Sequence, residues 1–244
     1  MTGASEAIAV DGLAGSILSG TTLEAVGDRF HKAVVAHGYT ASACRAFAPS
    51  AGGAEPRMLF RNWPGNWARL SDERGFASAS IMTTEARARL TPFTWLEARD
   101  SRPLTLPEQE VWESALAFGW RNGFVLPIHG PGGYFATISM GSLEHDLDLR
   151  PENRARLQML ATLTHERVCI LAGMMSREQP LNRMTPREIE CLRWVATGKT
   201  DPEIGEILSI SATTVKFHVD RARTKLGSRT RAQAVARLGL YGLY

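Results

Sequence analysis

The sequence predicts an α/β domain, in which helices cover the faces of one sheet in an α-β-α layered arrangement, followed by an all-α helix-turn-helix domain. Three observations support this prediction. Apolar and alternating runs typical of strands lie between helical patterns in residues 1–172, whereas residues 184–244 contain four short helical patterns with their own start signals. Residues 173–183 combine glycine, proline, serine and asparagine, which is typical of a linker.

The length and composition fit two globular domains. At 244 residues with 44% hydrophobic content, the chain can hold one core of ordinary size and a smaller second one. It shows no basic and apolar leader and no apolar run long enough to span a bilayer, so we expect a cytoplasmic protein without membrane contact. Cys44, Cys169 and Cys191 are widely spaced and odd in number, which argues against a disulfide framework and a zinc site.

The elements of the first domain follow in order. Residues 23–34 have the apolar spacing of an amphipathic helix, which Gly38 ends, and residues 151–172 form a longer helical pattern. Four strand-like runs lie between these helices, and a Gly-Pro-Gly-Gly turn joins the last two as a hairpin: residues 41–47, 58–63, 124–129 and 134–140. A sheet covered by helices can enclose a pocket.

Each helix of the second domain begins at a capping residue. A threonine or serine oxygen can accept from the backbone of the first turn, and a glutamate or glutamine three residues later completes a capping box at three of the starts. These residues are Thr185 with Glu188, Thr200 with Glu203, Ser211, and Thr230 with Gln233.

The third of these helices, residues 212–226, has one apolar and one polar face. Val215, Val219, Ala222 and Leu226 form its apolar stripe. The opposite arc carries Thr213, Lys216, Phe217, Asp220 and Thr224, and its flanks carry His218, Arg221, Arg223 and Lys225. Hydrogen-bonding side chains flanked by cations suit a major groove, where bases are read and phosphates neutralised, although a solvated packing module is the alternative.

The charge distribution favours DNA binding. Residues 180–244 contain 11 Lys and Arg against 6 Asp and Glu, whereas residues 1–179 contain 17 against 19. The small net charge of the whole chain, +3, therefore hides a basic C-terminal domain, as expected of a phosphate binder.

The C-terminal motifs resemble the DNA-binding domain of the LuxR family of bacterial transcription regulators. The matching residues are Thr185-Pro-Arg-Glu188, Leu192, Gly198-Lys199-Thr200, Glu203-Ile204, Ile207-Leu208, Ile210-Ser211, Thr214-Val215, His218 and Lys225-Leu226-Gly227. The signature of the family falls on Glu188, Leu192 and Gly198. The resemblance implies that Lys216 and Asp220 face bases, the acidic Asp220 accepting from a base such as cytosine. The full set of expected DNA contacts is Lys199, Thr200, Ser211, Thr213, Thr214, Lys216, Phe217, Asp220, Arg221 and Lys225.

Five of the six tryptophans lie in the first domain. Large aromatic side chains fill ordinary cores, but they also line ligand pockets, where an indole N–H can donate to a ligand carbonyl. Composition alone leaves both interpretations open.

Three tryptophan-containing motifs resemble the acyl-homoserine lactone-binding domain that precedes the LuxR-type DNA module: residues 62–67, 92–95 and 118–123, with Pro127 beyond. The resemblance implies that Trp67 donates to the lactone carbonyl, that Trp95 packs on the lactone ring and that Ser139 lies near the amide end. Trp63 stands where the family usually has a tyrosine. The expected ligand contacts are Trp63, Trp67, Ser71, Ser80, Phe93, Trp95 and Ser139.

Two positions depart from that family pattern. Ser71 replaces a tyrosine of the acyl channel, which widens the channel for an aryl or long-chain acyl group, and Ser80-Ile81 replace Asp-Pro, whose aspartate accepts the ligand's amide N–H. A carboxylate acceptor contributes about 1.5–3 kcal/mol and a neutral hydroxyl about 0.5–1.5, so the second exchange is expected to weaken binding by about one to two decades.

We therefore expect a transcription regulator in which a small molecule of acyl-homoserine lactone type fills the pocket and shifts folding or dimerisation toward a DNA-competent state, as in quorum sensing. The alternative keeps the DNA module but has a residual pocket, and binds DNA without ligand or under control of a protein partner. An enzyme is disfavoured, because the six histidines are scattered and the sequence lacks a phosphate loop, HExxH and GxSxG.

The expected partners are double-stranded promoter DNA in the nucleoid, a second copy of the chain and RNA polymerase, with no cofactor. A homodimer is expected because one recognition helix contacts few base pairs, so two copies read half-sites about one helical turn apart. The expected dimer contacts are the 151–172 helix, the 231–240 helix and the apolar tail that follows it.

Overall fold

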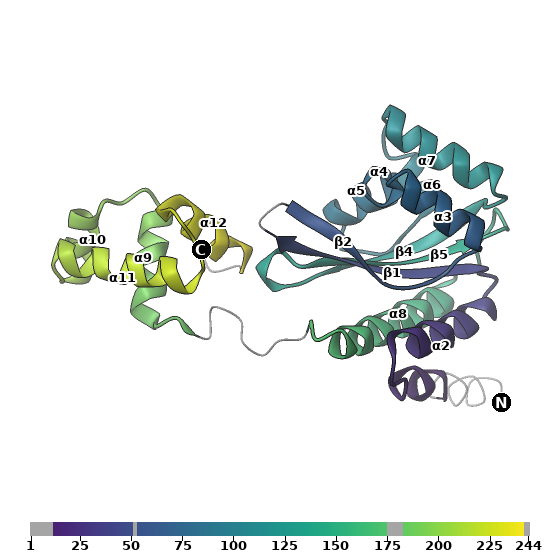
Figure 1. The fold of residues 1–244 in the computed structure, drawn as a ribbon, viewed down its shortest axis with the longest axis horizontal. Helices are drawn as coiled ribbons and strands as arrows, with labels where there is room; N and C mark the ends of the chain where they lie inside the picture. The colour runs from purple at the N-terminus through teal and green to yellow at the C-terminus, as the bar shows by residue number, and fades with distance from the viewer. Residues whose placement is uncertain (1–11, 51–52, 175–182, 242–244) are drawn as a thin grey trace. The chain divides into compact units, whose positions relative to one another are not determined.

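The computed structural model describes residues 12–50, 53–174 and 183–241, which belong to two compact units (Figure 1). The division falls between residues 175 and 176, within the segment 173–183 expected to be a linker; residues 175–182 of that segment lie outside the described residues. Gly173 has a positive φ of 66° and ends the preceding helix. Among the described helices, none is long and apolar enough to cross a membrane.

The first unit is built on one five-stranded antiparallel sheet, and this confirms the predicted class. Its order is β2-β1-β5-β4-β3. The strands are β1 (Ala41–Ser50), β2 (Gly53–Asn62), β3 (Phe93–Thr94), β4 (Asn122–His129) and β5 (Phe135–Ser142). The four predicted strands correspond to the four long ones, and β4 and β5 form the expected hairpin. The two-residue β3 escaped sequence analysis because it is too short to show alternation.

Helices cover both faces of the sheet (Figure 1). One face carries the two predicted helices, α2 (Leu23–Val35) and α8 (Pro151–Leu171). The other face carries five short helices that sequence analysis did not resolve: α3 (Gly65–Glu73), α4 (Phe76–Ala79), α5 (Ile81–Ala88), α6 (Trp95–Arg99) and α7 (Leu106–Ala117).

The alternation of β1 separates two cores. Cys44 and Ala46 pack in the cluster beneath α2 and α8, whereas Ala41 and Phe47 belong to the cluster beneath the five short helices. Successive side chains of a strand point to opposite faces, so Ala41, Ala43, Arg45 and Phe47 face the short helices.

A pair of glycines makes room for Trp95 on that second face. Gly123 of β4 and Gly141 of β5 are register partners. A Cβ at Gly123 would overlap the Trp95 ring and the Met140 carbonyl, and a Cβ at Gly141 would lie 3.1 Å from the same ring. The indole of Trp95 therefore lies directly against the sheet at this row.

The second unit consists of α9 (Pro186–Ala196), α10 (Asp201–Leu208), α11 (Ala212–Lys225) and α12 (Arg231–Leu240). Each begins at the predicted capping residue, with capping boxes at Thr185, Thr200 and Thr230 and an Ser211 hydroxyl that accepts from the Thr214 backbone N–H. The apolar stripe of α11 packs inward, with Val215 and Ala222 fully buried. This is the predicted helix-turn-helix arrangement.

Candidate functional sites

The first candidate site is a cavity between the sheet and the five short helices. Its free volume is about 90 Å³, well below the roughly 300–1000 Å³ typical of small-molecule sites. A ligand of acyl-lactone size can therefore enter only if wall residues move. The wall consists of Ala41, Ala43, Arg45, Trp63, Trp67, Ser71, Phe76, Ser80, Met82, Thr83, Trp95, Val111, Ala115, Trp120, Val125, Thr137, Ser139 and Gly141.

Six of the seven residues expected to contact ligand line this one cavity: Trp63, Trp67, Ser71, Ser80, Trp95 and Ser139. The structure does not place Phe93 among them. The Phe93 side chain is 1% exposed within the hydrophobic core beneath the short helices, and the Arg89 guanidinium lies 4.9 Å from its ring centre. Residues distant in sequence are thus gathered by the strands and short helices around one space.

An aromatic cluster forms one part of the cavity wall. The Trp67 ring centre lies 4.7 Å from that of Trp120, 5.3 Å from that of Phe118 and 5.7 Å from that of Phe76. Trp120 also lies 5.8 Å from Trp95, so it connects the two tryptophans expected to hold the lactone. Trp120 lies in the motif of residues 118–123, but no role in the cavity was predicted for it from the sequence.

The polar groups of the cavity wall include five hydroxyls and no carboxylate. Thr83 donates to the Ala77 carbonyl at 3.0 Å. Among the described residues, none is hydrogen-bonded to the hydroxyl of Ser71, Ser80 or Ser139, although Ser71 is 4% exposed. These hydroxyls have unused hydrogen-bonding capacity, but the carboxylate absent at Ser80 is not supplied from elsewhere on the wall.

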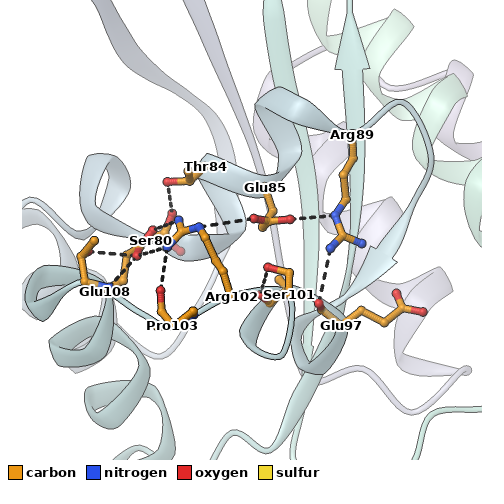
Figure 2. Close-up of polar contacts among 11 residues, drawn as sticks. Ser80, Thr84, Glu85, Arg89, Glu97, Ser101, Arg102, Pro103 and Glu108 are labelled. Atoms are coloured by element: carbon orange, nitrogen blue, oxygen red, sulfur yellow. Dashed lines mark hydrogen bonds and ion pairs between the residues drawn. The ribbon is translucent and has the colours of Figure 1, made fainter.

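A chain of ion pairs connects the helices that carry the wall (Figure 2). Arg102 donates to both carboxylate oxygens of Glu108 on α7, at 2.9 and 2.6 Å, and lies 3.8 Å from Glu85 on α5. Glu85 in turn accepts from Arg89 at 2.9 Å, and Arg89 donates to the Glu97 carbonyl of α6. These ion pairs and hydrogen bonds thus hold α5, α6 and α7 together.

Glu108→Gln is expected to lower the stability of the first unit in a pH-dependent way. The hydrogen bond from Arg102 lowers the pKa of Glu108 from 4.5 to about 2, against the opposing effect of burial. A depressed folded-state pKa stabilises the fold fully above about 4.5, and this contribution disappears as the pH falls toward 2. Urea midpoints should therefore differ between wild type and variant at pH 7 and converge only as the pH falls to about 2. Glu110→Gln is the control, because its ion pair with Arg74 is half exposed; a pH-independent difference for Glu108→Gln would contradict the assignment.

The second candidate site is the outer face of α11. Lys216, Thr213 and Phe217 are exposed there, with 54% of the Phe217 surface accessible. The Arg221 guanidinium lies 5.4 Å from the Phe217 ring centre, and Asp220 forms an ion pair with Arg223 at 3.2 Å. Exposed groups able to donate to, accept from and contact bases thus share one helix face.

Several of the other expected DNA contacts already have partners within the unit. Thr200 and Ser211 cap their helices, Thr214 is bonded to the Ser211 hydroxyl, and Lys199 lies 3.4 Å from Glu203. Thr200 and Ser211 are nevertheless exposed, and Lys199 and Thr214 are partly exposed. Capping residues lie at helix N-termini, which favour phosphate.

The side chain of Lys225, which was expected to contact DNA, forms an ion pair with Glu188 within the unit. Its Nζ donates to both carboxylate oxygens of Glu188, at 2.9 and 2.7 Å, and its side chain is only 22% exposed. Burial raises the pKa of Glu188, but hydrogen bonds from Lys225 and from the Thr185 backbone and hydroxyl outweigh it and lower the pKa. Lys225 thus fixes α11 against α9, which gives the signature glutamate a physical role that sequence analysis missed.

Comparison with known proteins agrees with this architecture. Residues 22–168 match the model of the autoinducer binding domain, and residues 182–238 match that of the bacterial regulatory proteins of the luxR family. The chain is 35% identical, over 88% of its length and 86% of the relative's, to the quorum sensing-dependent transcriptional regulator RpaR of Rhodopseudomonas palustris. It is 34% identical to the transcriptional activator BjaR1 of Bradyrhizobium diazoefficiens, over 73% of this chain and 72% of that one.

Solved structures share the fold. Escherichia coli SdiA superimposes with a TM-score of 0.69 at 22% identity, covering 96% of this chain and 97% of SdiA. The fold and sites define a transcription regulator with a small-molecule-binding domain and a helix-turn-helix DNA-binding domain. The chain belongs to the LuxR family of bacterial transcription regulators. That family consists of regulators, so the expectation that the chain is not an enzyme is confirmed.

Proposed function

We propose that the chain is a quorum-sensing regulator whose binding of promoter DNA is controlled by an acyl-homoserine lactone or a closely related molecule in the cavity. One observation carries the proposal: six residues from positions 63 to 139, expected separately to contact such a ligand, line a single cavity. SdiA has been solved with octanoyl-rac-glycerol, and CepR2 of Burkholderia cenocepacia is described as dependent on N-acylhomoserine lactone.

The small free volume of the cavity suggests how ligand acts. With about 90 Å³ free, a ligand that enters must displace aromatic wall residues and then complete the core with its own apolar surface. Ligand that binds only the folded state stabilises it by mass action. The ligand therefore shifts the population of the DNA-competent form instead of acting through direct contact with DNA.

We further propose that the regulator acts in the cytoplasm as a homodimer on promoter DNA, with RNA polymerase as a further partner there. Exposed apolar side chains on the expected dimer helices support this: Met159 and Ile170 on α8 are 38% and 48% exposed, and Leu240 on α12 is 49% exposed. Residues 242–244 of the expected contact lie outside the described residues. Two recognition helices related by a two-fold axis contact more base pairs than one, which a regulator needs to distinguish its site from the rest of the genome.

The test uses the purified full-length chain with N-octanoyl and N-dodecanoyl homoserine lactones. We expect each active lactone to raise the melting temperature and to increase the affinity for duplexes selected from a random library. Unchanged melting together with tight duplex binding in the absence of any lactone would establish the ligand-independent alternative. Failure to bind any duplex at low salt, with or without lactone, would overturn the proposal.

A further inference from the structure

Arg45 is the one charged residue of the cavity wall. It lies on β1 among small and apolar residues that share its face, Ala41, Ala43 and Phe47. The strand register places it beside Thr137 of β5, whereas Ala43 lies beside Ser139 and Ala41 beside Gly141. Arg45 is therefore four residues along β1 from the row that Trp95 covers, which is about 13 Å of strand.

The Arg45 guanidinium has no acidic partner in the part of the chain that the structure describes. The guanidinium lies over the Trp63 ring, 5.7 Å from the ring centre. The neighbouring carboxylate, Asp72, forms an ion pair with Arg61 instead, and Arg61 donates to both of its oxygens at 2.8 and 2.7 Å. The guanidinium of this wall residue, which has five N–H donors, thus has no carboxylate acceptor among the described residues.

Burial makes this arrangement unfavourable in the empty protein. Desolvation lowers the pKa of Arg45 to about 10, with the charge of Asp72 opposing the shift, so the side chain remains a cation at neutral pH. A partly buried cation without a counterion destabilises a fold, and replacement of such groups by apolar ones is often neutral or stabilising. An acceptor group within the cavity would relieve this desolvation.

We propose that Arg45 determines ligand specificity by selecting molecules that carry an oxygen acceptor on the acyl chain, at the end remote from the lactone. This inference rests on the proposed function and names the ligand class more narrowly. Trp67 and Trp95 hold the lactone head, and the acyl chain runs along the sheet past Ser139 toward Arg45 and Thr137. A hydroxyl or carboxylate oxygen there accepts from the guanidinium, the carboxylate in a two-bond arrangement that fits its planar fork.

The size of the preference follows from the strength of a charge-assisted hydrogen bond. Such a bond corresponds to about 10–100-fold in affinity over a chain that ends in a methyl group. A methyl-terminated ligand forms no hydrogen bond with Arg45. It also leaves the cation desolvated, and both effects lower its affinity.

The experiment compares three probes with the full-length protein: N-octanoyl homoserine lactone and its analogues with a terminal hydroxyl or a terminal carboxylate. Affinities are measured by titration of intrinsic tryptophan fluorescence. We expect one or both oxygen-bearing probes to bind about 10–100-fold more tightly than the octanoyl probe, and the better of the two identifies the acceptor. Arg45→Met should remove the preference, whereas Arg45→Lys should retain part of it for the carboxylate.

Arg69→Met is the matched control. Arg69 lies on α3, the helix that carries Trp67, but its side chain is exposed and is not part of the cavity wall, so its loss should leave the preference intact. A second readout needs no ligand: Arg45→Met should melt at the same or a higher temperature than wild type, because it removes a poorly solvated cation. Equal or tighter binding of the octanoyl probe by wild type, or a preference that survives in Arg45→Met, would overturn the inference alone. If no lactone binds at all, both this inference and the lactone-controlled function fail.

Discussion

Glu188→Ala is expected to destabilise the C-terminal unit by about 3 kcal/mol, a large fraction of the stability of a small domain, because it leaves the mostly buried Lys225 without its counterion. The Glu188 side chain is 2% exposed and accepts from Lys225 and from the Thr185 backbone. Its loss removes a capping box and an interhelical ion pair at once. Hydrogen exchange of the α9 and α11 backbone amides in the full-length chain measures the effect locally.

The neighbouring Glu190 provides the control. Its ion pair with Arg187 spans three residues of the same helix and is 38–44% exposed, so Glu190→Ala should change stability by less than about 0.5 kcal/mol. Adding Lys225→Met to Glu188→Ala should restore part of the lost protection, because the unpaired cation is then gone. Equal exchange protection in Glu188→Ala and wild type would show that the ion pair between Glu188 and Lys225 does not stabilise the unit.

Trp67→Ala should abolish any lactone-induced rise in melting temperature and lower the stability of the N-terminal unit by about 3–5 kcal/mol. Trp67 is 5% exposed and its ring contacts three others. No described residue accepts a hydrogen bond from its indole N–H, which leaves that donor for a ligand carbonyl. The measurement is the thermal melt with and without N-octanoyl homoserine lactone.

Trp67→Phe separates packing from hydrogen bonding, since it retains an aromatic ring but has no N–H. We expect near-native folding with a ligand response weakened by about tenfold in affinity. Trp112→Ala removes a half-buried tryptophan outside the cavity wall and should leave the ligand-induced shift unchanged. A shift in Trp67→Ala equal to that of wild type would exclude Trp67 from the site.

The C-terminal unit could be predicted almost entirely from sequence because its signals are local. Capping boxes at Thr185, Thr200 and Thr230 mark the observed helix starts, and glycines such as Gly198, with φ of 86°, mark the stops. The N-terminal unit depends on non-local contacts. Its strand order and its five short helices were not predicted, and α4 and α5 meet at Ser80 with no hydrogen bond from a side-chain cap to mark the junction.

The residues of the cavity, too, could be predicted only in part from the sequence. The resemblance supplied Trp67, Trp95 and the serines, and the structure gathers them around one space. Arg45 was missed, although a signal was present: it is the one charged residue of an otherwise uncharged strand, and it alternates in phase with Ala41 and Ala43. The alternation of side chains along β1 already placed it toward the short helices. Sequence alone could not show that Asp72, the nearby carboxylate, pairs with Arg61 instead.

Selection of bound duplexes from a random library tests the central claim, that the outer face of α11 reads DNA. Wild type should select two half-sites about one helical turn apart, and Lys216→Ala should lose the preference at one or two positions in each half-site, at about 1–3 kcal/mol per position. Lys199→Ala should keep the selected sequence while lowering affinity uniformly and flattening the salt dependence by about one phosphate contact. An unaltered selected sequence for Lys216→Ala would contradict the account.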